Sequence, residues 1–424
     1  MKPKILLLAG EESGVLYAEC LAVPLRSAGA ELRGYGDYGF KTADLAVFGI
    51  WEVLRRIFYF LRVARTMKRA IREWRPDVVV TIDYPGMNLK LAAYAKGLGI
   101  PAVHIVCPQV WAWHRGRIPK VAASLTKLLC FFPFEPELFK GTDLNAKFIG
   151  HPLVKLVENE VKHLPIKAED CARNMGTDPE KMGEKMGTDP DKNAVLQEKE
   201  VILALLPGSR RGEIQRILPR LLKAVTLMQS GALRATRPAD ATDKPWGQTL
   251  KTKGQTLKIV IPAANEMAER EIARIIASFD GLPPIEVQRG NARALLRKAT
   301  CAAVASGTAT LEAALVRCPT VLVYAVSPLL AWILRRAITG VRHAGLANII
   351  AEKCGFDPPM PELLQEAFTP EAAAGYLNSW LSDESARAEA SAKLDGAMAY
   401  LKAEGEPLEI AAQEIMGSVT CQRG

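Results

Sequence analysis

The stretch V-I-L-A-L-L-P-G-S-R-R-G-E, from Val201 to Glu213, decides the fold. Its six leading apolar residues are too few for a buried helix and are typical of a strand covered on both faces. A Pro-Gly-Ser break ends this strand, and Leu and Ile then recur at helical spacing from Glu213 to Leu222. The pattern predicts an α/β fold, with Gly208, Ser209 and Arg210 in a loop at the carboxyl edge of a parallel sheet, where doubly wound folds bind ligands.

This loop carries the residue types of a phosphate-binding site. Glycine lets the backbone come close to a ligand, free N–H groups at a helix start attract anions, and arginine can hold a phosphate through two parallel hydrogen bonds. The same loop also fits an ordinary strand-to-helix turn with a solvated arginine. From the loop alone both interpretations stay open.

The composition is that of a globular protein with anionic partners. The 424 residues are 49% hydrophobic and 24% charged, which excludes a disordered chain, and the length suits two domains. The formal net charge of +9 favours a nucleotide, a membrane surface or a nucleic acid without choosing among them. Eight cysteines without a C-x-x-C pair, and no secretory signal before the first strand, predict a cytoplasmic protein.

No stretch is predicted to span a membrane. The longest uncharged run, from Cys318 to Leu334, is interrupted by Pro319 and Pro328 and falls short of the roughly 20 residues that a spanning helix needs. It predicts a buried strand and then a helix that Ser327 caps and Pro328 starts.

The first strand is predicted from Lys4 to Ala9, and the loop after it holds Gly10, Ser13 and Gly14. A helix is predicted from Val15 to Ser27. Two glycines and a hydroxyl can cradle a ligand at this point. The plain first turn of a Rossmann-like domain has the same pattern and is the alternative.

A carboxylate ends the next buried strand, predicted from Asp77 to Asp83. An acid at the carboxyl tip of a parallel strand faces the ligand crevice, so Asp83 is the candidate general base. Its alternative role is to cap the helix predicted from Asn88 to Gly97.

The segment from Cys107 to Arg117 gathers two tryptophans, a histidine and two arginines. This combination suits stacking on a ring and binding an anion, with Gln109 and Trp111 as candidate substrate contacts. Trp111 equally fits packing between domains. His104, in the strand before this segment, is predicted to be a satisfied core histidine.

From Leu45 to Arg75 the chain is crowded with large apolar side chains ahead of a basic end. A core helix with a solvated basic end is one interpretation. The other is a membrane-interface surface, in which aromatic and aliphatic side chains enter the lipid and basic ones meet the headgroups. The side chains predicted to enter the membrane are Phe48, Trp51, Leu54 and Phe58.

A second phosphate-loop candidate follows the strand predicted from Cys301 to Ala305. Ser306, Gly307 and Thr308 open a helix whose N–H groups can meet a diphosphate, and Glu312 lies one turn on, where it can accept hydrogen bonds from a ribose. A threonine-capped core helix is the alternative.

Two polar segments each contain a short repeated sequence and are predicted to be surface inserts. M-G-T-D-P at 175–179 recurs at 186–190, and G-Q-T-L-K at 247–251 recurs at 254–258. A D-P-D match to metal-dependent glycosyltransferases lies inside the first insert, without a strand leading into it, and is taken as coincidence. The predicted limits are a first domain at 1–155, a linker at 156–200, a second domain at 201–368 with an insert at about 230–256, and C-terminal helices at 369–424.

In their order and spacing these motifs resemble the lipid-A-disaccharide synthases, the family-19 glycosyltransferases. The matching stretches are A-G-E-E-S-G (9–14), I-D-Y-P-G-M-N (82–88), C-P-Q-V-W-A-W-H-R-G-R (107–117), F-P-F-E (132–135), F-I-G-H-P-L (148–153), L-L-P-G-S-R-R-G-E-I (205–214), A-S-G-T-A-T-L-E (305–312) and G-L-A-N-I-I (345–350). The chain departs from the family pattern at Val15 and Gly86, where the family usually has aspartate. These positions lie beside Asp83, so acceptor contacts are in doubt more than the chemistry.

The resemblance implies a GT-B fold, in which two Rossmann-like doubly wound domains face a central cleft, with a helical C-terminal segment. It implies transfer of 2,3-diacylglucosamine from UDP to the 6-hydroxyl of 2,3-diacylglucosamine 1-phosphate with inversion, in lipid A biosynthesis. The expected partners are UDP-diacylglucosamine, the acylated monosaccharide phosphate and the anionic cytoplasmic face of the inner membrane, with no nucleic acid, metal or cofactor. The sequence leaves open whether the chain is a homodimer, what acyl lengths it takes and what the inserts do.

The resemblance also implies roles for the candidate residues. Asp83 is the base, Arg210 and the helix that starts at Ser306-Gly307-Thr308 neutralise the leaving diphosphate, and Glu312 holds the ribose. The further substrate contacts are expected at Gly10, Ser13, Gly14, Asn88, Gln109, Trp111, Gly208, Ser209 and Asn348.

Two rival functions remain open at this level. Another GT-B enzyme, such as a UDP-N-acetylglucosamine epimerase or the peptidoglycan N-acetylglucosaminyltransferase, shares the UDP half but has no need of an acyl-compatible apolar surface. A non-catalytic lipid- or nucleotide-binding module is the other class. The presence of Asp83, Arg210 and Glu312 together speaks against it.

Overall fold

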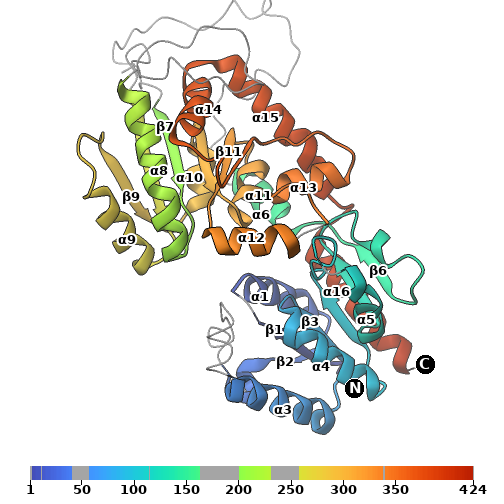
Figure 1. Cartoon of the computed structure of the whole chain (residues 1–424). Helices are drawn as coiled ribbons and strands as arrows, with labels where there is room; N and C mark the ends of the chain where they lie inside the picture. Colours follow the sequence, from blue (N-terminus) through green and yellow to red (C-terminus); the bar gives the residue numbers. More distant parts are fainter. Residues whose placement is uncertain are drawn as a thin grey trace, which may run out of the picture.

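The computed structural model describes residues 2–10, 12–40, 57–113, 115–162, 200–230, 257–337 and 340–423. Within these residues the chain forms two six-stranded sheets, and every strand pairing in them is parallel. Figure 1 shows them as a lower and an upper body. We call these the first unit and the second unit, and they confirm the predicted pair of doubly wound sheets.

The first unit has the strand order β2-β1-β3-β4-β5-β6. Its strands are β1 (Lys4–Ala9), β2 (Glu31–Arg33), β3 (Val78–Ile82), β4 (Ala102–Ile105), β5 (Lys127–Cys130) and β6 (Asn145–Phe148). Its helices are α1 (Glu12–Ser27), α3 (Ile57–Trp74), α4 (Pro85–Gly97) and α5 (Ile118–Ser124), with short 3-10 helices at Tyr35–Tyr38, Arg115–Arg117 and Pro136–Phe139.

The second unit has the strand order β12-β11-β10-β7-β8-β9. Its strands are β7 (Val201–Leu206), β8 (Leu257–Ala263), β9 (Ile285–Arg289), β10 (Cys301–Ala305), β11 (Thr320–Tyr324) and β12 (Glu362–Leu364). Its helices are α8 (Arg211–Ser230), α9 (Glu266–Ile276), α10 (Ala292–Lys298), α11 (Thr308–Leu315), α12 (Pro328–Ala337), α13 (Leu346–Lys353), α14 (Pro370–Ser382) and α15 (Glu384–Met398), followed by a 3-10 helix at Ala399–Leu401.

The central strands are apolar along their whole length because helices cover both faces of each sheet. Separate core clusters lie on the two faces of the second sheet, one against α8 and one against α11. On α8, Ile214, Ile217, Leu218, Leu221 and Leu222 form one fully buried stripe at helical spacing. Each such side chain contributes roughly 1.5–3 kcal/mol of burial free energy. The stripe therefore holds α8 in place directly after the loop that contains Gly208, Ser209 and Arg210.

Two helices connect the units. The helix α6 (Pro152–Lys162) follows β6, yet Leu153 and Val154 pack in a core cluster of the second unit. The last helix, α16 (Pro407–Arg423), returns to the first unit, where Ile415 packs against β1 and β3. Lys127 and Lys147 from β5 and β6 each form an ion pair with Glu414 of α16, at 2.5 and 2.6 Å. Figure 1 accordingly shows both chain termini in the lower body.

Several predicted elements agree with these bounds. The strands predicted at Lys4–Ala9 and Val201–Leu206 are β1 and β7, and Leu330 N donates to the Ser327 hydroxyl at the start of α12 as expected of a cap. The two repeat-containing inserts lie largely outside the described residues. The limits predicted for the domains stay a prediction, and α6 and α16 show why they are hard to place.

Candidate active site

Each sheet has one point where the strand order reverses. In the first sheet β1 pairs with both β2 and β3, and in the second β7 pairs with both β8 and β10. Doubly wound sheets bind ligands outside the carboxyl ends of the strands at such a point. The loops selected from the sequence, at 10–14, 83–88, 207–210 and 306–308, leave from β1, β3, β7 and β10. The candidate residues therefore share the two reversal points.

Asp83 follows β3 in a strained turn. Asp83 and Tyr84 both have left-handed backbones, with φ of 49° and 51°, and each such residue costs of order 1–3 kcal/mol. The carboxylate of Asp83 is half-buried, and its Oδ1 accepts a hydrogen bond of 2.8 Å from Tyr84 N. Its Oδ2 accepts no hydrogen bond from any residue that the structure describes. Burial raises the pKa of this carboxyl above its ordinary value.

Asn88 and Gly10 support this turn. The Asn88 amide is fully buried, donates to the carbonyls of Ile82 and Asp83 at 3.1 and 2.8 Å, and accepts from the Tyr35 hydroxyl at 2.9 Å. A Cβ at Gly10 would lie 2.5 Å from the Tyr84 ring. The prediction that Asn88 contacts substrate is thus corrected, because its polar atoms are bonded inside the fold. Position 10 needs glycine because any side chain there would overlap the Tyr84 ring.

Tyr17 of α1 is affected by charged residues of both units. Burial raises the pKa of Tyr17 to about 12, and the negative charges of Asp83 and Glu312 act in the same direction, while Arg293 opposes them. Asp83 belongs to the first unit, whereas Glu312 on α11 and Arg293 on α10 belong to the second. The charges of the candidate base and of the candidate ribose ligand therefore both act on Tyr17.

The loop after β7 has a fixed geometry. Gly208 has φ of 103°, and a Cβ there would lie 2.6 Å from Oε2 of Glu213. Ser209 and Arg210 are exposed, and Nη1 of Arg210 lies 3.3 Å from Oε1 of Glu213. The charges of Glu213 and Arg210 also act on Tyr324, at the end of β11, whose pKa burial raises. Arg210 thus stands at the carboxyl edge of the second sheet, with its guanidinium held by a carboxylate.

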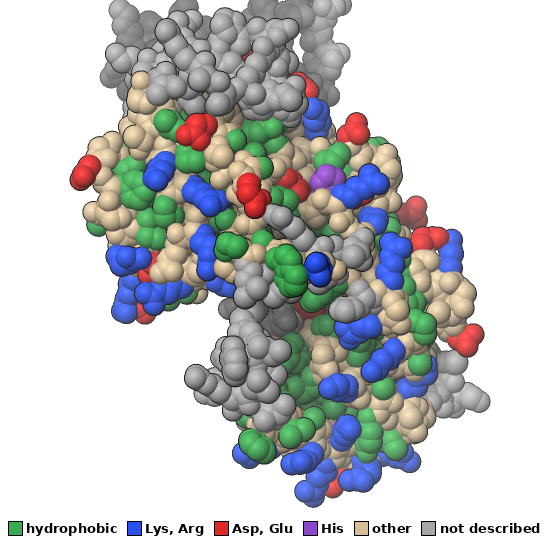
Figure 2. All heavy atoms as spheres, viewed as in Figure 1, with side chains coloured by type: hydrophobic (Ala, Val, Ile, Leu, Met, Phe, Trp, Pro, Cys, Tyr) green, Lys and Arg blue, Asp and Glu red, His purple; other side chains and the backbone are tan. Residues whose placement is uncertain are grey.

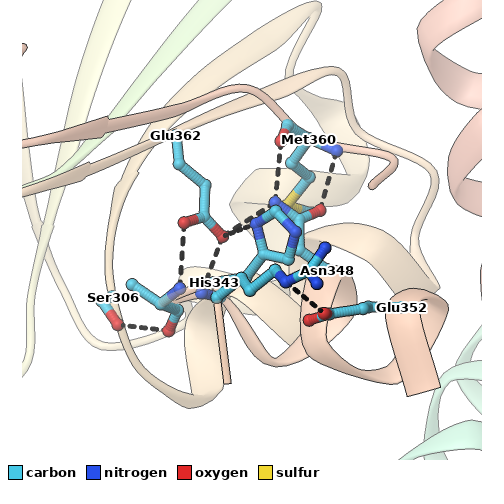
Figure 3. A network of polar contacts seen from close by, with 9 residues as sticks. Ser306, His343, Asn348, Glu352, Met360 and Glu362 are labelled. Atoms are coloured by element: carbon cyan, nitrogen blue, oxygen red, sulfur yellow. Dashed lines mark hydrogen bonds and ion pairs between the residues drawn. The ribbon is translucent and has the colours of Figure 1, made fainter. Parts of the chain in front are cut away.

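The loop after β10 is tied to the segment before α13, as Figure 3 shows. The Ser306 hydroxyl donates to the carbonyl of Ala344 at 2.9 Å. The N–H groups of Ala344 and Gly345 donate to the two carboxylate oxygens of Glu362, at 2.9 and 3.0 Å. Glu362 therefore fixes the segment on which Ser306 rests. Gly307 and Thr308 remain exposed at the start of α11, where the helix dipole favours an anion.

Asn348 belongs to the same network and does not face a ligand. It is fully buried, its amide donates to Glu362 Oε1 and to the carbonyl of Met360, and it accepts from Met360 N, at 2.8, 2.8 and 3.0 Å. The prediction of a substrate contact at Asn348 is corrected for this reason. Nδ1 of His343 lies 3.8 Å from Oε1 of Glu362, so the carboxylate also holds this side chain (Figure 3).

A family model described as lipid-A-disaccharide synthetase matches residues 5–173 and 245–413. The chain belongs to the lipid-A-disaccharide synthetase family. A curated relative, the lipid-A-disaccharide synthase of Syntrophus aciditrophicus (strain SB), is 32% identical over 384 residues, which are 88% of this chain and 87% of that protein. As a member of the lipid-A-disaccharide synthetase family, the chain is a glycosyltransferase of lipid A disaccharide synthesis that uses a UDP-sugar.

Two solved structures have the same fold. Acinetobacter baumannii MurG superimposes with a TM-score of 0.52 at 13% identity, over 98% of this chain and 99% of that chain. The UDP-GlcNAc 2-epimerase from Neisseria meningitidis, bound to UDP-GlcNAc, gives a TM-score of 0.53 at 10% identity, over 99% of this chain and 100% of that one. The GT-B arrangement implied for a lipid-A-disaccharide synthetase is confirmed.

Trp111 packs between the two units of this chain. It is 3% exposed, its Nε1 donates to Oε1 of Glu135 at 3.1 Å, and its ring lies edge-on to Phe132 and Phe134. Ile349 of α13 packs in the same cluster. The alternative of packing between domains is therefore the one that the structure supports, and the predicted substrate contact is corrected. Gln109 is exposed on the same loop.

Only part of the predicted membrane segment falls within the described residues. Phe48, Trp51 and Leu54 lie outside them, whereas Phe58 on α3 is 82% exposed. The opposite face of α3 is buried through Val63, Met67 and Ile71, and five basic side chains are exposed along the helix: Arg62, Arg65, Lys68, Arg69 and Arg72. Figure 2 shows Lys and Arg gathered over the lower body. No helix within the described ranges is both long and apolar enough to span a membrane.

Some residues of the site could not be recognised from the sequence pattern around them. Tyr17 and Arg293 were not predicted, because only the folded chain brings them near Asp83 and Glu312. Glu362 was missed as well, although an acid directly after Pro361 at the start of a short strand could have marked it. Gly14 is buried, and a Cβ there would lie 3.5 Å from the carbonyl oxygen of Ile82, at ordinary contact distance, so the start of α1 lies against the end of β3. Ser13 lies on the first turn of α1.

Proposed function

We propose that the chain is the inverting enzyme that transfers 2,3-diacylglucosamine from UDP to the 6-hydroxyl of 2,3-diacylglucosamine 1-phosphate. Asp83 is the general base, and Arg210 with the start of α11 binds the leaving diphosphate. The observation that carries this proposal is the placement of the candidate loops at the carboxyl ends of β3, β7 and β10, where the strand order of each sheet reverses. A base on one unit and a nucleotide ligand on the other must face a common space for a sugar to pass between their substrates.

The reaction is a single in-line displacement. The acceptor 6-hydroxyl oxygen attacks the anomeric carbon of the α-linked donor as its proton passes to Oδ2 of Asp83. The bond from that carbon to the diphosphate oxygen breaks, and its electron pair leaves with UDP. The new bond is β-1,6, so the anomeric centre inverts.

The environment of Asp83 fits a base for this step. Burial raises its pKa toward neutrality, which strengthens it as a proton acceptor. Its Oδ1 is held by Tyr84 N and the backbone of the turn by Asn88, so Oδ2 is the atom that points to a hydroxyl. The strained turn thus supplies orientation as well as basicity.

The leaving diphosphate gains one further negative charge as the bond breaks, between two loops of neighbouring strands. β7 pairs with β10, so the loop of Gly208, Ser209 and Arg210 lies beside the start of α11. Arginine can bind two phosphate oxygens at once, and the N–H groups of Gly307 and Thr308 add the partial positive charge of a helix start. Glu312, one turn into α11, then accepts from the ribose.

The enzyme works at an anionic membrane surface, on the cytoplasmic face of the inner membrane. The exposed Phe58 enters the lipid, and the basic face of α3, named above, meets the headgroups. Both substrates carry acyl chains, so the surface also brings the active site to them. Homodimerisation remains a prediction from the sequence.

UDP release tests the reaction directly. The chain is incubated with UDP-2,3-diacylglucosamine alone and then with 2,3-diacylglucosamine 1-phosphate added. Release that depends on the acceptor, with a disaccharide 1-phosphate as product, is the expected result. Turnover of UDP-N-acetylglucosamine without acyl chains would favour a different UDP-sugar enzyme. UDP binding without release under any condition would refute catalysis.

A further inference from the structure

An apolar groove runs along α1 and includes Tyr17 in its lining. It has a volume of about 570 Å³ and lies between α1, α6 and the start of α16. Its apolar lining includes Leu16, Tyr17, Val23 and Pro24 from α1, Leu156 from α6 and Leu408 from α16. We call it the α1 groove.

The α1 groove begins at the reaction site. Tyr17 lines it, one turn of α1 after Gly14, where a Cβ would lie 3.5 Å from the carbonyl oxygen of Ile82, the residue before Asp83. From Leu16 to Ser27, both of which line the groove, the rise of 1.5 Å per residue gives α1 a length of about 16 Å. A chain attached to a sugar at Asp83 can therefore enter at Tyr17 and extend along the helix.

The lining favours a hydrocarbon chain over an anionic group. Leu16 and Val23 are 46% and 65% exposed, although both are large apolar side chains. Glu406 and Glu409 lie at the α16 side of the groove and repel a phosphate. Lys155 also lines the groove, and its ammonium lies 3.0 Å from Glu158 in an ion pair. The groove thus offers apolar surface together with two carboxylates and a lysine that is already ion-paired.

We propose that the α1 groove binds one acyl chain of the acceptor. The assignment to the acceptor follows from the base, since α1 and Asp83 belong to the same unit and the acceptor hydroxyl must reach Asp83. This inference rests on the proposed function, because it takes the acceptor to carry acyl chains. Each methylene buried in the groove is expected to strengthen acceptor binding about fourfold.

Cys20 provides a direct probe of occupancy. It is a half-buried free cysteine in the groove lining, and Cys354, a half-buried free cysteine on the second unit, is an internal control. The full-length chain is alkylated with N-ethylmaleimide, and the rate at each cysteine is followed by peptide mass spectrometry. Long-chain 2,3-diacylglucosamine 1-phosphate at ten times its Kd is expected to slow Cys20 about tenfold and leave Cys354 unchanged.

A short-chain version of the same acceptor, at the same multiple of its own Kd, is the matched ligand. It is expected to leave Cys20 reactive, because its chains end before the middle of the groove. Unchanged alkylation with the long-chain acceptor, equal protection by both acceptors, or equal slowing at Cys354 would each overturn the proposal.

A variant gives a second readout. Val23→Glu places a charge at the exposed rim of the groove, and Met267→Glu, at a 42% exposed side chain on α9, is the control. Val23→Glu is expected to raise KM for the long-chain acceptor about tenfold or more, without changing KM for the short-chain acceptor or the donor. An equal rise for both acceptors, or no rise, would overturn the assignment to an acyl chain.

The two experiments separate the groove from the proposed function. Protection of Cys20 needs no turnover, so a protected Cys20 with no UDP release would refute the reaction and keep the groove. UDP release that depends on the acceptor, with an unprotected Cys20, would refute the groove and keep the reaction.

Discussion

Asp83 and Tyr84 hold two consecutive left-handed conformations, which only a well-braced turn sustains. The brace comes from Asn88, whose buried amide binds the Asp83 carbonyl, and from Gly10, which leaves room for the Tyr84 ring. Aspartate is among the few residues that tolerate this backbone region. The turn therefore selects both the residue type and the direction of its carboxylate.

Asp83→Asn is expected to lower kcat by about 100-fold or more while the fold survives, since asparagine tolerates the same backbone and only the base is lost. Asp143→Asn, at an exposed aspartate of the first unit, is the control and should keep full activity. Steady-state UDP release and a thermal unfolding curve measure both effects. Near-normal turnover in Asp83→Asn would remove Asp83 from the mechanism.

The pH profile of the unmodified enzyme should show the ionisation of the Asp83 carboxyl. The base acts only when deprotonated, and burial raises its pKa, so kcat/KM is expected to fall tenfold per pH unit below a value higher than that of an ordinary carboxyl. This acid limb should be absent from the residual activity of Asp83→Asn. An identical limb in both proteins would assign it to another group.

Arg210→Ala is expected to reduce kcat about 100-fold but to weaken UDP binding by less than about tenfold, since Arg210 acts mainly on charge that develops as the diphosphate leaves. Arg216→Ala, at an exposed arginine on the next turn of α8, is the matched control. Kinetics give the first quantity and calorimetric titration with UDP the second. Equal losses in both would mean that Arg210 only holds the nucleotide.

At the scale of single residues, the sequence predicted where the candidate residues lie in the fold better than it predicted what their side chains contact. Asp83, Arg210 and Thr308 follow apolar strands, so their place at the sheet edge is set by local pattern. Asn88 and Asn348 also lie in stretches that match the family, yet both are buried in hydrogen-bond networks. Nothing local distinguishes a polar residue that binds substrate from one that binds the backbone.

At the scale of elements, prediction succeeded where burial on both faces produces a continuous apolar run. β1 and β7 agree with their predicted bounds for this reason. β12 was not predicted, since its three residues, Glu362–Leu364, are too few for a pattern. The return of α16 to the first unit was not predictable, because its amphipathic pattern does not say which sheet it covers.

The α3 helix carries a prediction of its own. Phe58→Asp is expected to weaken binding to vesicles that contain phosphatidylglycerol about tenfold or more, because an 82% exposed phenyl ring would otherwise enter the lipid. Phe356→Asp, at a 41% exposed phenylalanine on the second unit, should bind as the unmodified chain does. Vesicle sedimentation at low and high salt measures both. Equal binding by all three proteins would place the membrane surface elsewhere.

At the scale of the whole molecule, the two units meet in a cluster around Trp111 and Ile349. Gly340 N donates to the carbonyl of Ala112 at 3.0 Å, so the contact includes backbone from both sides. A Cβ at Gly340 would lie 2.1 Å from the Trp111 carbonyl oxygen. The relative position of the units thus depends on a glycine that the sequence did not single out.

Gly340→Ala is expected to force this contact apart and to lower kcat/KM about tenfold or more, because small displacements of catalytic groups are costly in rate. Gly396→Ala on α15 is the control, since a Cβ there meets nothing within 4 Å and alanine favours a helix. UDP-release kinetics and thermal unfolding compare the two. Full activity in Gly340→Ala would show that the units align without this contact.

The path of α16 has a consequence for how the enzyme is made. The first unit contains β1, yet Ala411, Ile415 and Val419 of its core come from α16, which follows the second unit in the sequence. A ribosome must therefore finish the whole second unit before the first can close. While translation continues, the nascent first sheet leaves apolar surface open near β1 and β3 until α16 has been made.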